Sequence, residues 1–193
     1  MKSKIPQVSI IITNYNYGKY ISRCLRSCLS QNHIDAEIIV VDDKSTDNSL
    51  EILSGFGDAI RVIKNEKNVG VAKSSNIGIN VAKSQFVIRV DSDDFINADT
   101  CFFMRRYLIE NHDAFCVSCD YVLVDDYENI IERKYAKDLP ISCGIMYRRD
   151  LLLELGGYDE KMRHKEEEEL RHRLSGFYKI HHLQIPFYRY RMH

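Results

Sequence analysis

The sequence predicts an α/β protein with a mostly parallel, doubly wound sheet and a smaller antiparallel region in its second half. Two observations lead to this prediction. In the first half, short apolar runs alternate with segments whose apolar residues recur at helical spacing. In the second half, two longer apolar segments flank a turn-prone stretch, which is typical of an antiparallel hairpin.

Length and composition set limits on the class of protein. The 193 residues are 45% hydrophobic, enough for one well-buried core, so we expect a single domain over residues 1–193. The formal net charge of -1 provides no overall field that would attract nucleic acid or an anionic membrane. No apolar run approaches the ~20 residues of a membrane span, and residues 1–6 are too short for a signal peptide. We therefore expect a cytoplasmic protein.

The six cysteines are predicted to be reduced thiols in the core. Cys116 and Cys119 form a C-x-x-C pattern, but in a strand these positions point to opposite faces, and no second pair at zinc-finger spacing accompanies them. The other four lie in predicted helices or strands: Cys24, Cys28, Cys101 and Cys143.

The first half is expected to form a βαβαβαβ unit. Asn48, with Glu51 three residues later, gives the second helix a capping pattern. The expected strands are residues 8–12, 38–41, 60–63 and 86–90, and the helices between them include residues 21–29, 48–53 and 71–82.

The second half is less regular. A helix over about 99–110, capped by Asn97, leads to two strands that we expect to pair as an antiparallel hairpin. The two hairpin strands are residues 115–124 and 130–135. The later elements are a strand at 141–147, helices at 150–155 and 166–174, a turn at 156–159, and an aromatic, basic tail at 185–192.

Three carboxylates, Asp91, Asp93 and Asp94, follow the fourth predicted strand within four residues. Carboxylates this close repel one another, so a divalent cation or a dense set of donors is needed between them. Hard oxygen ligands suit magnesium or manganese, which would leave positions for diphosphate oxygens. The alternative is capping of the next helix, for which Asn97 and Asp99 are better placed.

Asp42 and Asp43 end the second predicted strand and could accept hydrogen bonds from a base or a ribose. Alternatively, with Asp47, they serve the N-terminus of the following helix. Because ligands of open α/β sheets bind beyond the carboxyl ends of the strands, both acidic clusters are expected to share one site.

Thr13, Asn14 and Tyr15 follow the first strand and offer a hydroxyl, an amide and an aromatic face, which suit a nucleotide. A polar loop that caps the next helix is the alternative.

Asn68, Gly70 and Lys73 belong to a turn into the third helix, where backbone amides and the lysine could meet a phosphate. Simple capping of that helix explains the same residues.

Residues 166–169 are four consecutive glutamates, usually a solvated helix face. Glu166 and Glu167 begin the helix after the Gly-Gly-Tyr-Asp turn, where a partly buried carboxylate could act as a general base. His193 could be a further metal ligand or a frayed chain end.

Taken together, these motifs resemble family 2 glycosyltransferases over nearly the whole chain. The segments that carry the resemblance are residues 8–16, 40–47, 68–78, 90–94 and 156–159. The resemblance implies the GT-A fold and an inverting transfer of a sugar from a nucleoside diphosphate donor, UDP-sugar above all. It implies a nucleotide-sugar-binding half over residues 1–95 and an acceptor-binding half over residues 96–193.

The resemblance also implies roles for individual residues. Thr13, Tyr15 and Asp43 would hold the base, often uracil, and Asp91-Ser92-Asp93 would be the D-x-D element that binds Mn²⁺ or Mg²⁺ and ribose. His193 matches a histidine that can reach the metal in relatives.

Two positions depart from the family pattern. Glu167 stands where relatives commonly carry the aspartate that acts as base, so the base has the same chemistry on a longer side chain. Ser75 stands where an arginine often precedes Asn76, so diphosphate contact would fall to Lys73.

The resemblance further implies a hexosyltransferase-type enzyme that acts on a glycan or lipid-linked acceptor in surface polysaccharide or lipopolysaccharide synthesis, at the inner face of the cell membrane. A non-catalytic nucleotide-sugar-binding module is an alternative. A nucleotidyltransferase is a further one, although residues 13–18 lack the Gly-rich, basic loop that would grip a triphosphate.

Overall fold

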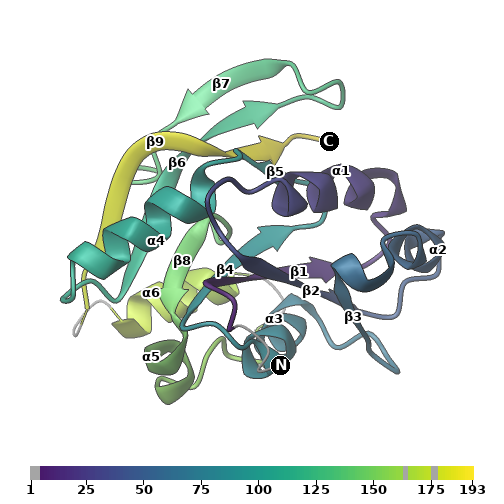
Figure 1. Cartoon of the computed structure of the whole chain (residues 1–193), viewed down its shortest axis with the longest axis horizontal. Helices are drawn as coiled ribbons and strands as arrows, with labels where there is room; N and C mark the ends of the chain where they lie inside the picture. Colours follow the sequence, from purple (N-terminus) through teal and green to yellow (C-terminus); the bar gives the residue numbers. More distant parts are fainter. Residues whose placement is uncertain (1–4, 163–164, 175–177) are drawn as a thin grey trace.

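The structure is a computed structural model that describes residues 5–162, 165–174 and 178–193. Four parallel strands form one half of its sheet, in the order β3-β2-β1-β4 (Figure 1). Their interiors are nearly continuous apolar runs, as expected for strands covered by helices on both faces. They are β1 (Val8–Asn14), β2 (Ala36–Asp42), β3 (Arg61–Lys64) and β4 (Phe86–Asp91).

Beyond β4 the sheet becomes mixed. β8 pairs antiparallel with both β4 and β6, β9 runs parallel to β6, and the short β5 closes this end. β7 pairs antiparallel with β6 as a hairpin. These strands are β5 (Phe95–Ile96), β6 (Cys116–Val124), β7 (Ile130–Lys134), β8 (Ile145–Arg148) and β9 (Ile180–Arg191).

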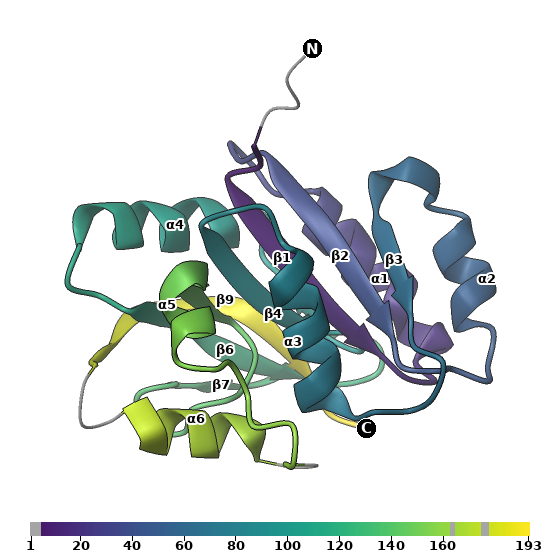
Figure 2. The same ribbon diagram turned by 90° about the horizontal axis from the view of Figure 1, so that it is seen from below.

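Helices cover both faces of the sheet, which creates two buried cores. α1 and α4 lie on one face, and α3, α5 and α6 on the other (Figures 1 and 2). The helices are α1 (Gly18–Leu29), α2 (Ser49–Ser54), α3 (Val71–Val81), α4 (Thr100–Glu110), α5 (Arg149–Glu154) and α6 (Glu166–Leu174), with a short 3-10 turn, η1 (Gly57–Ala59), before β3.

The predicted α/β class, the parallel first half and the β6–β7 hairpin are confirmed. All six cysteines are free and buried. Cys116 and Cys119 belong to different cores, so they do point to opposite faces of β6. Among the described residues, no helix is long and apolar enough to cross a membrane.

Two predicted elements differ in their bounds, and one element was not predicted. The tail expected over 185–192 begins at Ile180, where it starts to pair with β6. β5, only two residues long, was not predicted. The strand expected from residue 141 begins at Ile145, because Gly144 has a φ of +69°, a left-handed conformation that breaks an extended chain. Cys143 therefore lies in a loop and not in a strand.

Candidate active site

The parallel register brings the polar strand ends together. Thr13 of β1 lies between Val41 of β2 and Asp91 of β4, and Asn14 lies beside Asp42. Because β1 is the central strand of this group, residues from three strands meet at one edge of the sheet.

A cleft lies over this edge. It consists of two adjoining cavities of about 920 and about 290 Å³ that share Tyr15, Tyr17, Asp43 and Val71. The larger extends over the turn into α3, including Asn68, Gly70 and Lys73, and the smaller reaches Thr13, Asn14, Ser74, Asp91, Ser92, Asp93 and Tyr190. The two predicted acidic clusters thus face one common cleft.

Asp43 fixes the loop that forms one wall. It is 4% exposed, and its carboxylate accepts hydrogen bonds from the Asn65 side chain and from the backbone N–H groups of Val69 and Gly70, each at 2.8 Å. A carboxylate has about four acceptor positions, so one can still face the cleft. Asp43 therefore both builds the wall and lines the cavity.

Asp42 is buried and turned toward its neighbours. Its oxygens accept from the Asn14 amide at 2.9 Å and from the Ser45 N–H at 3.0 Å. The hydrogen bond between Asn14 and Asp42 joins the ends of β1 and β2. A direct contact of Asp42 with a nucleotide stays a prediction.

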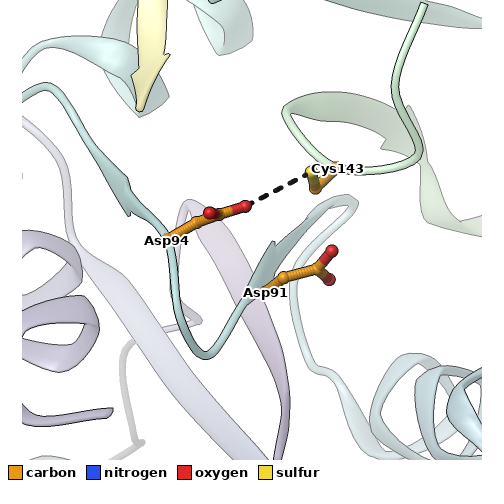
Figure 3. Close-up of side chains that lie close together, drawn as sticks. All are labelled: Asp91, Asp94 and Cys143. Atoms are coloured by element: carbon orange, nitrogen blue, oxygen red, sulfur yellow. Dashed lines mark hydrogen bonds between the residues drawn. The ribbon is translucent and has the colours of Figure 1, made fainter. Parts of the chain in front are cut away.

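The acidic cluster after β4 is partly embedded in protein. Asp94 is 2% exposed and accepts hydrogen bonds from the Tyr188 hydroxyl and the Arg191 N–H, both at 2.8 Å. Figure 3 shows the Cys143 thiol pointing at Asp94, with Sγ 3.8 Å from Oδ2, and Asp91 beside them. Burial, together with the charges of Asp91 and Asp93, raises the pKa of Asp94 well above its usual value.

Asp93 is the member of the acidic cluster that lies beside His193. Its pKa is raised, first by burial and then by the charge of Asp91. His193 Nε2 lies 3.6 Å from Asp93 Oδ2, and the imidazole stacks on Tyr20 of α1, with ring centroids 5.4 Å apart. The chain end is therefore placed beside the cluster and over α1.

These residues fit a hard divalent cation. Asp91 and Asp93 present carboxylates to the cleft, and carboxylate oxygens suit Mn²⁺ or Mg²⁺. Among the described residues, ligand atoms of Asp91, Asp94 and Cys143 lie within 4.8 Å of one another, and the His193 imidazole lies beside Asp93. The pKa values of Asp93 and Asp94 are raised first by burial and then by the charges of neighbouring aspartates, and a bound cation would favour the charged carboxylates against both effects. Asp94 has most of its acceptor positions filled by protein donors, so it is better placed to support the site than to bind the ion.

A buried ion pair behind the cluster was not predicted. Arg89, in the middle of β4, is 5% exposed; its Nη1 lies 2.8 Å from Glu166 Oε1 and its Nε 3.1 Å from Asp91 Oδ1. Burial alone would lower the pKa of Arg89, but Asp91, Tyr158 and Glu166 hold it well above its usual value. A charged residue inside an otherwise apolar run was the available signal, although its partners could not be read from the sequence.

The two candidate base residues differ in their surroundings. Glu166 is buried and bound by Arg89, whereas Glu167, half-buried at the start of α6, is joined to no other described residue by a hydrogen bond or ion pair. Glu167 is thus the carboxylate with free acceptor positions.

Asn76 has a structural role that the sequence did not reveal. Its amide donates to the Tyr158 carbonyl at 2.8 Å and accepts from the Tyr158 N–H at 3.0 Å, which locks the Gly-Gly-Tyr-Asp turn against α3. Nearby, Lys73 Nζ lies 2.8 Å from Glu160 Oε2 across the same junction. The turn is therefore held next to the residues predicted to contact the diphosphate.

Comparison with known proteins agrees with this geometry. The sequence matches the family described as Glycosyl transferase family 2 over residues 9–177. It is 35% identical to a hyaluronan synthase of Pasteurella multocida over 60% of this chain and 12% of that protein. It is 29% identical to the putative glycosyltransferase EpsH of Bacillus subtilis over 97% of this chain and 61% of that protein.

Among solved structures, S. aureus TarS 1-349 in complex with UDP-GlcNAc superposes with a TM-score of 0.82 at 25% identity, covering 97% of this chain and 59% of that one. The chain spans less than two thirds of the length of each of these three proteins. The family match nevertheless covers most of this chain and includes every residue that lines the cleft except Tyr190. The chain belongs to glycosyl transferase family 2, with the GT-A type of α/β fold.

Proposed function

We propose that the protein is an inverting glycosyltransferase that moves a sugar from a nucleoside diphosphate donor to an acceptor hydroxyl. The observation that carries the proposal is the single cleft lined by Asp43, Tyr15 and the Asp91–Asp93 element. Aromatic faces and an acceptor carboxylate suit a base at one end, and paired carboxylates suit a metal-bound diphosphate at the other.

UDP is the proposed nucleotide. The TarS structure with the same fold was solved with UDP-GlcNAc, which supports a UDP-sugar for this chain as well. In this arrangement Thr13, Tyr15 and Asp43 contact the base and Asn68, Gly70 and Lys73 approach the diphosphate, while Asp91 and Ser92 lie nearest the ribose. The proposed first half, residues 1–95, supplies all of these groups.

Mn²⁺ or Mg²⁺, held by Asp93 and Asp91 with His193 as a further ligand and Asp94 as support, would neutralise charge on the departing diphosphate. The reaction is a single displacement. Glu167 takes the proton of the acceptor hydroxyl, and the resulting oxygen attacks the anomeric carbon on the face opposite the leaving group. The bond from that carbon to the diphosphate oxygen breaks, and UDP leaves with the bonding electrons.

Glu167 is the better candidate for the base because Glu166 already shares its oxygen with Arg89. A carboxylate bound to a buried guanidinium gives up acceptor capacity that proton transfer needs. Glu166 is therefore proposed to position α6, and Glu167 to carry the proton.

The proposed acceptor is a glycan or lipid-linked saccharide in surface polysaccharide synthesis at the inner face of the cell membrane. Similarity to a hyaluronan synthase, a polysaccharide-forming protein by name, supports a polymer as the product class.

The test is turnover of a panel of UDP-, GDP-, CMP- and TDP-sugars with Mn²⁺. We expect a UDP-sugar to be consumed, and Glu167→Gln to lower the rate about 10²- to 10⁴-fold with UDP affinity retained. Glu168→Gln, on the same helix but exposed and paired with Lys165, is the matched control and should keep the wild-type rate. A wild-type rate in Glu167→Gln would remove the base assignment, and metal-dependent UDP binding without any turnover would favour a binding module.

A further inference from the structure

We propose that a small cavity on the acceptor side of the acidic cluster binds one anionic group, a carboxylate or a phosphate, carried by the acceptor. That the bound molecule is the acceptor rests on the proposed glycosyl transfer. The anion site itself does not, because it is argued from its own lining.

The cavity has a volume of about 180 Å³. This is below the ~300–1,000 Å³ typical of pockets that enclose a whole small molecule, so it fits one charged group or one ring. Its polar lining consists of Ser118, Lys137, Arg171 and His182. No carboxylate occurs among the described residues that line it, and the remaining wall is apolar or thiol: Cys119, Ala136, Pro140, Ile141, Cys143, Ile145 and Ile180.

Arg171 is the main reason to expect an anion. Its Nη1 atom is buried and has no hydrogen-bond partner in the described part of the chain. A buried charged donor without a partner is costly, whereas hydrogen bonds between a guanidinium and a carboxylate or phosphate are among the strongest in proteins. Arg171 also lines the cavity, so an anion bound there would lie beside its guanidinium group.

The opposite wall is held rigid by a hydrogen-bonded chain across β6 and β9. Ser118 Oγ lies 2.9 Å from His182 Nδ1, and His182 Nε2 lies 2.7 Å from Asp120 Oδ1. Asp120 is fully buried, and its other oxygen lies 2.8 Å from Arg133 Nη2. Asp120 is thus balanced by Arg133 and does not line the cavity, so it does not cancel the positive charge that Arg171 and Lys137 bring there.

The position of the cavity connects it to the acceptor. Cys143 lines the cavity, and its Sγ lies 3.8 Å from Asp94 Oδ2 (Figure 3). Arg171 lies one helical turn after Glu167 on α6, so both project from the same side of that helix. The nucleotide cleft lies across the acidic cluster, lined by different residues. A group in this cavity would therefore sit beside the proposed base, where the acceptor must approach.

The test is an NMR titration of the ¹⁵N-labelled protein with three sugars of similar size: glucuronate, glucose 6-phosphate and neutral glucose. We expect at least one of the two anionic sugars to shift the backbone amide signals of Ser118 and His182, and glucose to leave them in place. The anion that binds more tightly identifies carboxylate or phosphate as the preferred group.

Arg171→Met should weaken that binding at least about tenfold, because it removes a hydrogen bond between charged groups. Arg171→Lys, which keeps the charge, should recover most of the affinity, and thermal melting shows whether each variant is folded. Arg106→Met is the control: Arg106 is an exposed arginine on α4 whose ion-pair partner is Glu110.

The proposal is overturned if glucose shifts the same signals as the anions, if Arg171→Met binds as tightly as wild type, or if the anions shift only cleft residues such as Tyr15 and Asn68. A failure of the proposed function would look different. UDP with Mg²⁺ would then leave the cleft signals unchanged, while the anion titration could still be read.

Discussion

At the scale of single residues, Asp94 shows how the fold holds negative charge next to the cleft. The Tyr188 hydroxyl and the Arg191 N–H bind its carboxylate, yet burial and two neighbouring aspartates still raise its pKa well above its usual value. The folded protein without a cation therefore holds a proton on this cluster at a pH where the unfolded chain does not.

This difference predicts a pH dependence of stability. A carboxyl group whose pKa is higher in the folded protein than in the unfolded chain favours folding most at a pH below its unfolded-state pKa of about 3.9. This contribution to stability is lost as the pH rises through the pKa of the folded state. Measured without metal by thermal melting between pH 5 and 8, Asp94→Asn should lose less stability with rising pH than wild type. Asp58→Asn, at an exposed turn, should follow the wild-type slope; equal slopes for all three proteins would contradict the prediction.

At the scale of elements, Arg89 joins β4 to α6 through Glu166, and both side chains are 5% exposed. Removing one partner of a buried pair leaves an uncompensated charge, which typically costs about 3–5 kcal/mol. We expect Arg89→Met to lower the free energy of unfolding by about that amount in urea denaturation. The double variant Arg89→Met/Glu166→Gln should recover part of the loss; a double variant that is less stable than Arg89→Met would argue against the pairing.

The Gly-Gly-Tyr-Asp turn depends on a close approach between Gly157 and α3. A Cβ at Gly157 would lie 2.5 Å from the Asn76 side-chain oxygen, whereas one at Gly156 would meet nothing within 4 Å. Both glycines have positive φ, +84° and +66° in chain order, so alanine at either costs roughly 1–2 kcal/mol for backbone conformation alone.

Gly157→Ala should therefore destabilise the protein more than Gly156→Ala, since it also displaces Asn76 and breaks its paired hydrogen bonds to Tyr158. Chemical denaturation of the two variants measures the difference. Equal losses would mean that Asn76 can move aside without cost.

At the scale of the whole molecule, the sequence allowed the first half to be predicted well because each strand there is a local apolar run that pairs in parallel with its neighbours. The strand ends carry Thr13, Asp43 and Asp91, so their convergence followed from the topology. The second half depends on long-range pairing, such as β6 with β9, whose paired residues are 64 to 67 positions apart in the chain and leave no periodic signal. The contacts of Arg89, Asn76 and Arg171 could not be predicted for the same reason.

The convergence of distant segments on one cleft leads to the last prediction. UDP with Mn²⁺ should slow amide hydrogen exchange together in residues 13–17, 67–74 and 91–93, because these three segments line the two adjoining cavities. At a concentration about 100 times its dissociation constant, a ligand that binds only the folded state stabilises that state by about 2.7 kcal/mol. The melting temperature should therefore rise as well. UDP with a chelator is the control and should protect less around residues 91–93, where the cation is proposed to bind. Protection confined to a single strand end would show that the segments do not act as one site, since a nucleotide diphosphate that spans the cleft must contact all three.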